Sequence, residues 1–205
     1  DADIHEVAKG IGLDPRIGPS FLEAGIGYGG YCLPKDLRAF AKIGAQHQVD
    51  FSLLEQVDHI NEQRIDKLIH KVSNALSHID GKTIGILGLS FKPNTDDIRE
   101  APSLKVIAKL LEEGYFLRLY DPQAMDNTKQ IITDNSKVVF TNSPYEAAEQ
   151  SNAIIILTNW DEFISLDFLQ IKRIMSSPII IDGRNCLNPE AIKSLGLEYY
   201  AMGRS

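Results

Sequence analysis

Short, nearly uninterrupted apolar runs alternate with helix-like segments through the second half of this chain. The apolar runs are "TIGILGLS", "FLRLYD", "VVFT", "AIIILTN" and "IIIDG", and helical patterns occupy residues 103–113, 125–133, 143–150 and 166–175. Strands that are apolar on both faces are typical of a parallel sheet with helices on both sides. The alternation therefore predicts an α/β fold built on a doubly wound parallel sheet of five strands.

The first half of the chain follows a different pattern. Between residues 53 and 79 apolar side chains recur every three or four positions, which predicts one long helix with a single apolar stripe. The "DGK" at residues 80–82 is expected to end this helix, and "DIHEVAKGIG" is typical of an earlier helix that stops at Gly10 or Gly12. The two expected domains are a central helical region, residues 1–80, and the sheet domain, residues 81–205.

Charge and composition exclude several classes of partner. The 205 residues carry a formal net charge of -7, which does not suit binding to nucleic acid or to an anionic membrane. No apolar run reaches the roughly 20 residues of a membrane helix, and the first residues do not resemble a signal peptide. The two cysteines and five histidines share no metal-ligand spacing. We expect a cytoplasmic protein with reduced thiols and no metal.

Ligands of doubly wound sheets bind at the carboxyl ends of the strands. That edge is expected to carry "LSFKPNTDDIREAPS", Asp121, "TNWDEF" and "DGRN". Lys92 and Arg99 supply cations suited to phosphate oxygens, and Phe91 supplies a flat surface for a base or a sugar. Gly85 and Gly88 fall within the first strand pattern instead of forming G-x-G-x-x-G at its exit, so this half is not expected to hold a dinucleotide.

The segment "GIGYGGYCLPKD", residues 25–36, surrounds one cysteine with four glycines and a proline. Glycine lets the backbone approach a ligand closely and adopt positive φ, and Lys35 and Asp36 place a cation and an acid near the Cys32 thiol. A thiol so equipped is a candidate nucleophile. Two alternatives stay open: Cys32 is a small buried residue in a tight turn, or Asp36 caps a helix that begins in "LRAFAKIGAQH".

"FLEAGIGYGGYCLPKDLRAF" and "GLSFKPNTDDIREAPS" occur in this order, and together they resemble the two signatures of the UDP-glucose/GDP-mannose dehydrogenase family. The resemblance extends over essentially the whole chain and is greatest to the members that oxidise UDP-glucose. It implies a Rossmann-like UDP-binding domain over residues 81–205. It also implies that the complete enzyme oxidises the primary alcohol of the sugar to a carboxylate, with two NAD and one water. Cys32 would carry the thiohemiacetal and the thioester, and Asp36 would activate water or relay protons.

The resemblance also implies the binding residues. For the substrate they are Arg16, Phe21, Leu22, Glu23, Ala24, Gly25, Gly29, Phe91, Lys92 and Arg184, and for the cofactor NAD they are Lys35 and Arg99. Alternatives remain for three of them: Arg16 and Arg184 as surface salt-bridge partners, and Phe21 as ordinary core. We interpret Asp96 and Asp97 as turn formers or as the N-cap of the following helix.

Full-length members of the family begin with a Rossmann domain that carries G-x-G-x-x-G at the exit of a strand, and no part of this sequence resembles that domain. We therefore expect the C-terminal portion of a dehydrogenase, inactive by itself, that forms a homodimer through the apolar stripe of the long helix. A GDP-mannose dehydrogenase and a stand-alone nucleotide-sugar binding module remain as alternatives. Cys186 is expected to be structural, and Trp160 is expected to pack at a strand end.

Overall fold

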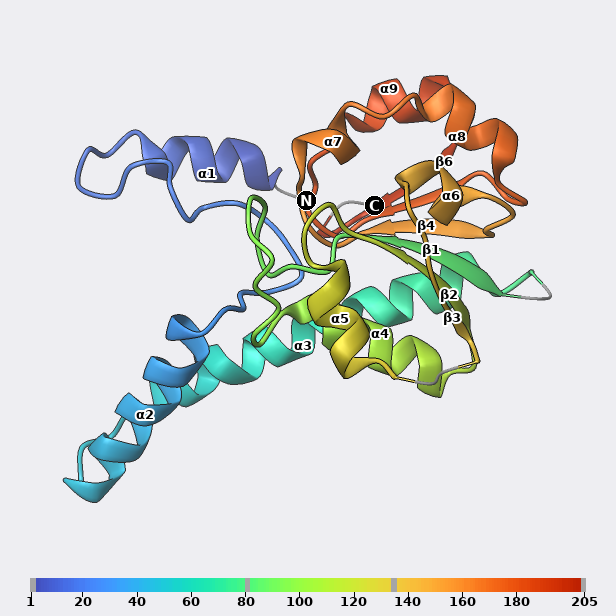
Figure 1. Cartoon of the computed structure of the whole chain (residues 1–205). Helices are drawn as coiled ribbons and strands as arrows, with labels where there is room; N and C mark the ends of the chain where they lie inside the picture. Colours follow the sequence, from blue (N-terminus) through green and yellow to red (C-terminus); the bar gives the residue numbers. More distant parts are fainter. Residues whose placement is uncertain (1–2, 80–81, 134–135, 204–205) are drawn as a thin grey trace.

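The computed structural model describes residues 3–79, 82–133 and 136–203 of the chain. A six-stranded parallel sheet forms its centre, with the strand order β3-β2-β1-β4-β5-β6 (Figure 1). The strands are β1 (Thr83–Leu87), β2 (Phe116–Tyr120), β3 (Val138–Phe140), β4 (Ala153–Ile156), β5 (Ile179–Asp182) and β6 (Glu198–Ala201). The strand order reverses between β1 and β4, as in doubly wound folds, and the predicted fold class is confirmed.

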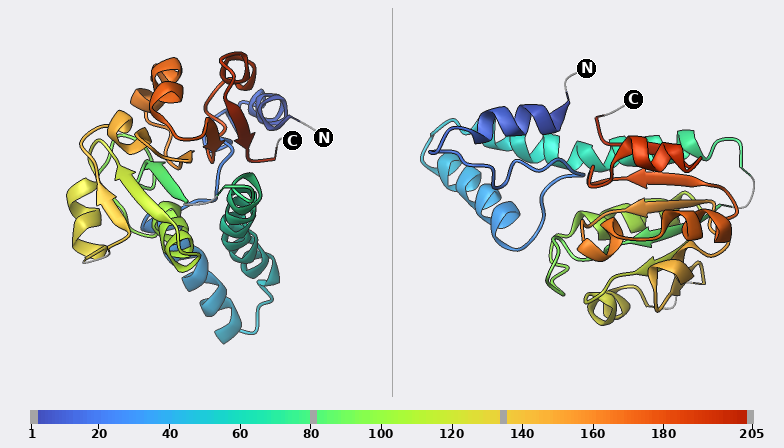
Figure 2. Two further views of the ribbon diagram at one scale, coloured as in Figure 1. Left: turned by 90° about the vertical axis from the view of Figure 1, so that its right-hand side faces the viewer. Right: turned by 90° about the horizontal axis from the view of Figure 1, so that it is seen from above.

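Helices cover both faces of this sheet (Figure 2). The helices between the strands are α4 (Pro102–Glu112), α5 (Met125–Ile131), α6 (Pro144–Ala148), α7 (Asp161–Ile164), α8 (Phe168–Ile174) and α9 (Pro189–Ser194). Successive side chains of a strand point to opposite faces. Ile155 of β4 accordingly packs in the cluster that contains Ile107 of α4, whereas Ile154 and Ile156 pack in the cluster that contains Ile171 of α8. Burial on both faces explains the uninterrupted apolar runs of the central strands.

The sheet has one strand more than the sequence predicts. β6 pairs in parallel with β5 at the edge of the sheet. Its Glu198 is exposed, and Tyr199 and Tyr200 are only half-buried. An edge strand with this composition lacks the apolar run that marks the central strands, so the prediction of five strands is wrong by one.

The residues before the sheet form α1 (Ile4–Gly12), α2 (Cys32–Gln46) and α3 (Ser52–Ala75). α2 and α3 lie side by side as a hairpin that projects from the sheet domain (Figures 1 and 2). α3 confirms the predicted long helix, although it ends at Ala75; residues 80 and 81 of the expected stop lie outside the described residues. The second half of α3 enters the core of the sheet domain through Ile65, Leu68, Ile69 and Val72.

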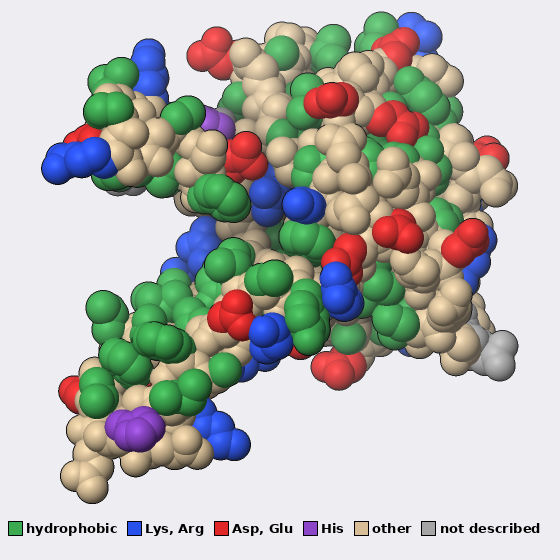
Figure 3. Space-filling view, turned by 60° about the vertical axis from the view of Figure 1, so that its left-hand side comes forward, with side chains coloured by type: hydrophobic (Ala, Val, Ile, Leu, Met, Phe, Trp, Pro, Cys, Tyr) green, Lys and Arg blue, Asp and Glu red, His purple; other side chains and the backbone are tan. Residues whose placement is uncertain are grey.

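Large apolar side chains are exposed on α1 and on the hairpin (Figure 3). α1 has no buried residue, and it ends at Gly12, as the sequence predicts. On the hairpin the exposed fraction is 59% for Phe40, 50% for Ile43 and 75% for Leu53. Despite this apolar surface, no helix in the described part of the chain is long and apolar enough to cross a membrane.

Candidate active site

The glycine-rich segment before Cys32 runs against the loop that follows β1. The Gly30 amide donates a hydrogen bond to the carbonyl oxygen of Arg99 at 3.0 Å. Gly30 has a φ of 83°, and a Cβ there would lie 2.8 Å from the Phe91 ring. A Cβ on Gly29 would lie 2.4 Å from the carbonyl oxygen of Glu100. Only glycine permits this approach, so the two signature segments of the sequence are in direct contact.

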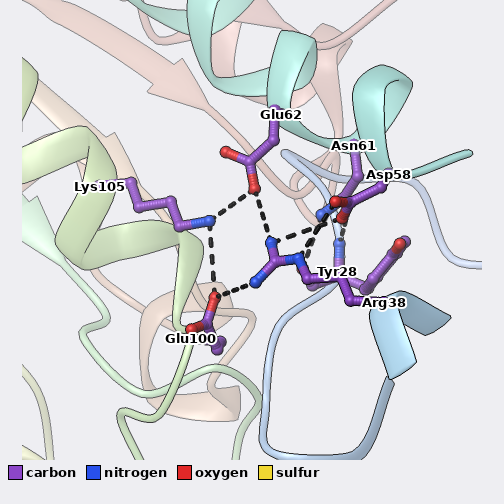
Figure 4. A network of polar contacts seen from close by, with 7 residues as sticks. All are labelled: Tyr28, Arg38, Asp58, Asn61, Glu62, Glu100 and Lys105. Atoms are coloured by element: carbon purple, nitrogen blue, oxygen red, sulfur yellow. Dashed lines mark hydrogen bonds and ion pairs between the residues drawn. The ribbon is translucent and has the colours of Figure 1, made fainter. Parts of the chain in front are cut away.

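The two upstream glycines are equally confined. A Cβ on Gly25 would lie 2.6 Å from Nη1 of Arg184, and a Cβ on Gly27, whose φ is 114°, would lie 2.6 Å from Oδ1 of Asn61. Asn61 accepts a hydrogen bond from the Tyr28 amide at 2.8 Å and donates one to the Tyr28 carbonyl oxygen at 3.1 Å (Figure 4). These glycines therefore let the segment pass close to other parts of the protein, a role that the sequence does not reveal.

Cys32 is the first residue of α2, and its thiol is free and exposed. The alternative that it is a small buried residue is therefore wrong. The first turn of a helix presents N–H groups without helical partners and the positive end of the helix dipole, so it favours negative charge nearby. Pro34 fits in this turn because its missing N–H costs no helical hydrogen bond. The thiol is accessible at a helix N-terminus, where a nucleophile can meet a substrate.

Lys35 and Asp36 follow Cys32 on α2 and bond to each other. Nζ of Lys35 donates a hydrogen bond to Oδ1 of Asp36 at 2.5 Å, and both side chains are exposed. This hydrogen bond is the main cause that raises the pKa of Lys35. Because α2 begins at Cys32, Asp36 lies inside the helix, and its alternative role as a helix cap is wrong.

Tyr31 brings together the two residues predicted to contact the cofactor. Nζ of Lys35 lies 5.2 Å from the centre of the Tyr31 ring, and the guanidinium carbon of Arg99 lies 4.7 Å from it. Both distances are within the range of a cation–π contact. Two cations from separate segments therefore gather at the residue that precedes Cys32.

Asp97 shapes the loop that carries Arg99. Its carboxylate accepts hydrogen bonds from the Arg99 amide at 2.9 Å and from Nε and Nη2 of the Arg99 side chain at 3.0 and 2.7 Å. The Arg99 side chain lowers the pKa of Asp97. The interpretation of Asp97 as a turn former is confirmed; its role as the N-cap of the next helix is wrong, because the N-cap of α4 is Ala101.

Phe91 and Lys92 lie in the same loop. The Phe91 ring packs partly against the core, and Nζ of the exposed Lys92 lies 5.4 Å from the ring centre. The ring borders Gly30, so an aromatic face and a cation adjoin residues 25–36, which we call the cysteine segment. This combination suits a nucleotide sugar, which offers a flat base and a charged diphosphate.

Arg184 is a mostly buried cation with an incomplete set of partners. Its side chain is 16% exposed, and burial lowers its pKa. Among the described residues, its Nε has no hydrogen-bond partner, and its ion pair with Glu23 is long, 3.9 Å. This arrangement does not fit the alternative of a surface salt bridge. A buried guanidinium with a free donor suits an anionic ligand such as a phosphate.

Arg16 and Phe21 are predicted substrate residues that are strongly exposed. Arg16 is 87% exposed and forms an ion pair with Asp14 at 2.6 Å, as the surface salt-bridge alternative predicts. Phe21 is 97% exposed and has a φ of 63°, so its alternative role in the core is wrong. Their neighbours differ in burial: Leu22 and Ala24 are half-buried, and Glu23 is exposed.

The turn after β1 does not fit a dinucleotide. The prediction that Gly88 lies within the first strand is wrong, because β1 ends at Leu87. A Cβ on Gly88 would lie 2.5 Å from the Thr158 nitrogen. The next two N–H groups, those of Leu89 and Ser90, donate to Oδ2 of Asp121 at 2.7 and 3.2 Å. A dinucleotide-binding fold leaves the N–H groups of this turn and an acidic residue free for the cofactor. Here the protein itself occupies both.

Two buried carboxylates support the strand ends. Asp121 also accepts a hydrogen bond from Nε1 of Trp160 at 3.2 Å, and Trp160 is 6% exposed, which confirms that it packs at a strand end. Asp182 accepts hydrogen bonds from the Arg184 amide at 2.9 Å and from the Tyr199 hydroxyl at 2.8 Å. Burial raises the pKa of the nearby Cys186 thiol, which fits its predicted structural role. The described residues contain no group of three or more acidic, cysteine or histidine side chains placed to hold a metal ion.

Family models match two parts of the chain. Residues 1–63 match the central domain of the UDP-glucose/GDP-mannose dehydrogenase family, and residues 85–189 match the UDP binding domain of the same family. Together these matches include the cysteine segment and the loop after β1.

Curated relatives and solved structures agree with these matches. The chain is 42% identical over 203 residues to the UDP-glucose 6-dehydrogenase YwqF of Bacillus subtilis and 39% identical to a UDP-glucose 6-dehydrogenase of Rickettsia bellii. It spans 46% of the length of each of these relatives. A UDP-glucose dehydrogenase structure from Pyrobaculum islandicum aligns with 96% of this chain and 42% of its own, with a TM-score of 0.81 and 31% identity. A UDP-D-ManNAc dehydrogenase from Pyrococcus horikoshii aligns with 99% of this chain and 44% of its own, with a TM-score of 0.80 and 28% identity.

Proposed function

The chain belongs to the UDP-glucose/GDP-mannose dehydrogenase family, and on that premise we propose that it forms the C-terminal half of a UDP-glucose 6-dehydrogenase. The complete enzyme would oxidise UDP-glucose to UDP-glucuronate in two steps. The observation that carries the proposal is the exposed Cys32 thiol at the start of α2, held against a loop that presents Phe91 and Lys92. The identity to UDP-glucose 6-dehydrogenases supports the choice of substrate.

Cys32 is proposed as the covalent nucleophile. Its Sγ would form a carbon–sulfur bond to the aldehyde carbon of the half-oxidised sugar, and oxidation of that adduct would give a thioester. Water then breaks the same carbon–sulfur bond, which releases the carboxylate and restores the thiol. Asp36 lies four residues further along the same helix and is exposed, so it is proposed to take the proton of the attacking water.

The substrate is proposed to bind between the cysteine segment and the carboxyl edge of the sheet. Arg184 offers a buried, unpaired donor to the diphosphate, beside the backbone of Gly25. Lys92 would add a second cation, and Phe91 would face the sugar or the base. The exposed Phe21 and Arg16 would contribute contacts outside this centre.

NAD is proposed to bind chiefly to a part of the enzyme that this chain does not contain. NAD supplies the two hydride acceptors when it is bound; this chain would add only the contacts of Lys35 and Arg99. The turn after β1 does not fit a dinucleotide, because Asp121 occupies its N–H groups. We therefore expect this chain to be inactive without its N-terminal half.

A homodimer in the cytoplasm is the proposed form of the enzyme. The exposed apolar side chains of Phe40, Ile43 and Leu53 on the hairpin support a dimer interface there. The free, exposed thiol of Cys32 suits a reducing compartment. Sedimentation of this chain as a monomer at high micromolar concentration would argue against the dimer.

The proposed function is tested in the full-length protein by comparing Cys32→Ser with the matched variant Cys186→Ser. We expect the wild type to form UDP-glucuronate with two NADH per sugar, Cys32→Ser to form none, and Cys186→Ser to retain most activity. Product is measured by chromatography and NADH by absorbance. Oxidation of GDP-mannose in place of UDP-glucose would refute the substrate, and normal acid formation by Cys32→Ser would refute the thioester role.

Asp36→Asn separates the proposed proton transfer from a purely structural role. If Asp36 activates water, turnover should fall by roughly 100-fold or more, and a burst of NADH should precede a stalled enzyme with sugar nucleotide attached to Cys32. Mass spectrometry of the intact protein detects the added mass. Near-normal turnover without an adduct would refute the role.

A further inference from the structure

The segment that carries Cys32 is attached to α3 on both sides of the cysteine. Four residues before Cys32, the amide and the carbonyl of Tyr28 both bond to the Asn61 side chain, at 2.8 and 3.1 Å. Six residues after it, Nε of Arg38 donates to Oδ2 of Asp58 at 3.1 Å and Nη2 of Arg38 lies 3.4 Å from Oε1 of Glu62. The two attachments use a single turn of α3. We call Asp58, Asn61 and Glu62 the α3 clamp (Figure 4).

The α3 clamp is also connected to α4 and to the loop after β1. Oε1 of Glu62 accepts from Nζ of Lys105 on α4 at 2.6 Å. Arg38 and Lys105 both contact Glu100, with nitrogen–oxygen distances of 3.6 and 3.7 Å. Glu100 belongs to the loop after β1, and its carbonyl oxygen is the group that Gly29 approaches. One polar network therefore joins the cysteine segment, α3, α4 and the loop of Phe91 and Lys92 (Figure 4).

Apolar packing contributes little to fixing the position of residues 25–38. In the segment from residue 25 to residue 38, the buried residues are Ile26, Gly29, Gly30 and Pro34. The Arg38 ion pairs are 43% exposed at the arginine, and exposed ion pairs contribute little each. The two hydrogen bonds of Asn61 are partly buried and satisfy both the backbone N–H and the backbone C=O of Tyr28. Asn61 therefore contributes more to holding the segment than any other residue of the α3 clamp.

We propose that Asn61 is a positioning residue that fixes the Cys32 thiol relative to the loop of Phe91 and Lys92. Its role in turnover rests on the function proposed above; its effect on the segment does not. Without the Asn61 side chain, the Tyr28 amide and carbonyl lose their partners and Gly27 loses its close neighbour. The nucleotide contacts on Phe91, Lys92 and Arg184 stay in place, whereas the thiol shifts.

Two measurements test the proposal with Asn61→Ala, Asn61→Asp and the control Asn74→Ala, an exposed asparagine on the same helix. In this 205-residue chain, we expect Asn61→Ala to speed amide hydrogen exchange about tenfold in peptides from residues 25–38, with no change in the strands. In the full-length protein, we expect its kcat for UDP-glucose to fall about 10- to 100-fold, since small displacements of a reacting group cost this much, while KM changes less than about threefold. Asn61→Asp keeps the acceptor for the Tyr28 amide but turns a second acceptor toward the Tyr28 carbonyl oxygen, so it should not restore the wild-type values.

The outcomes separate the two proposals. Unchanged exchange in residues 25–38 overturns the clamp whether or not the enzyme is active. Equal effects of Asn74→Ala, or a rise in KM without a fall in kcat, also overturn it, because either result shows no specific placement of the thiol. If the wild-type protein does not oxidise UDP-glucose, the proposed function is refuted. The exchange measurement still tests whether Asn61 holds residues 25–38 in place.

Discussion

Asp121 provides the most direct test of how the strand ends are held together. The residue is 1% exposed. Oδ2 accepts from the Leu89 and Ser90 amides, the Ser90 hydroxyl and the Trp160 indole, and Oδ1 accepts from the Gln123 and Ala124 amides at 2.9 and 2.8 Å. Asp121→Asn replaces one of these acceptors by an NH2 group, which cannot accept.

Fewer hydrogen bonds are lost when the NH2 group takes the place of Oδ1 than when it takes the place of Oδ2. Two amides, those of Gln123 and Ala124, then face a donor in place of an acceptor. An unsatisfied buried donor costs about 1–3 kcal/mol, so Asp121→Asn should lower the free energy of unfolding by about 2–6 kcal/mol. This is a large part of the roughly 5–15 kcal/mol by which domains are usually stable.

Urea titration measures this loss. Far-ultraviolet circular dichroism gives the free energy of unfolding, and the fluorescence of Trp160, the single tryptophan of the chain, reports on the same strand ends. The matched control is Asp126→Asn on α5, where the carboxylate is 92% exposed and a change within about 0.5 kcal/mol is expected. A loss below about 1 kcal/mol for Asp121→Asn, or an equal loss for the control, would show that the hydrogen bonds of Asp121 do not hold the strand ends together.

Gly29→Ala should lower the free energy of unfolding by about 1–3 kcal/mol, because its Cβ would lie 2.4 Å from the Glu100 carbonyl oxygen; an unchanged urea midpoint contradicts this. Iodoacetamide should alkylate the exposed Cys32 at least ~10-fold faster than Cys186, because burial raises the pKa of the Cys186 thiol. Peptide mass spectrometry measures the two rates, and faster alkylation of Cys186 would contradict the prediction. Arg99 lowers the pKa of Asp97 in the folded state, so this pair stabilises the fold above the unfolded pKa of about 4 and loses the effect as the pH falls through the lower, folded pKa. Asp97→Asn should therefore lower the free energy of unfolding by up to about 1 kcal/mol at pH 7. A cost that does not shrink as the pH is lowered from 7 would disprove the pairing.

The central sheet could be predicted from the sequence because burial on both faces leaves a local mark. Ile154, Ile155 and Ile156 are fully apolar neighbours that serve two different cores, and such a run has few other interpretations. β6 left no comparable mark, because Glu198 is exposed at the edge of the sheet. Short-range composition thus predicts strands that need apolar surface and misses strands that do not.

The candidate site was predictable only in part, because its parts meet across long stretches of chain. The cysteine segment and the loop after β1 stand out by their glycines and charges, yet the contact between Gly30 and Phe91 joins residues far apart in the sequence. Asn61 and Arg38 lie in "INEQR" and "DLRAF", where they look like ordinary helix-surface residues. A polar side chain that bonds to a distant backbone gives no periodic signal.

α3 is anchored in the core of the protein at one end only. Its second half is embedded in the core from Ile65 onward, while its first half, from Ser52, extends into the hairpin over about 20 Å at 1.5 Å per residue. Bending of a helix anchored in this way moves its free end, the tip, most and its anchored part, the root, least. Cys32 begins the antiparallel helix beside the root, whereas Gln46 ends it near the tip. Motions of the hairpin therefore displace its outer apolar surface far more than they displace the thiol.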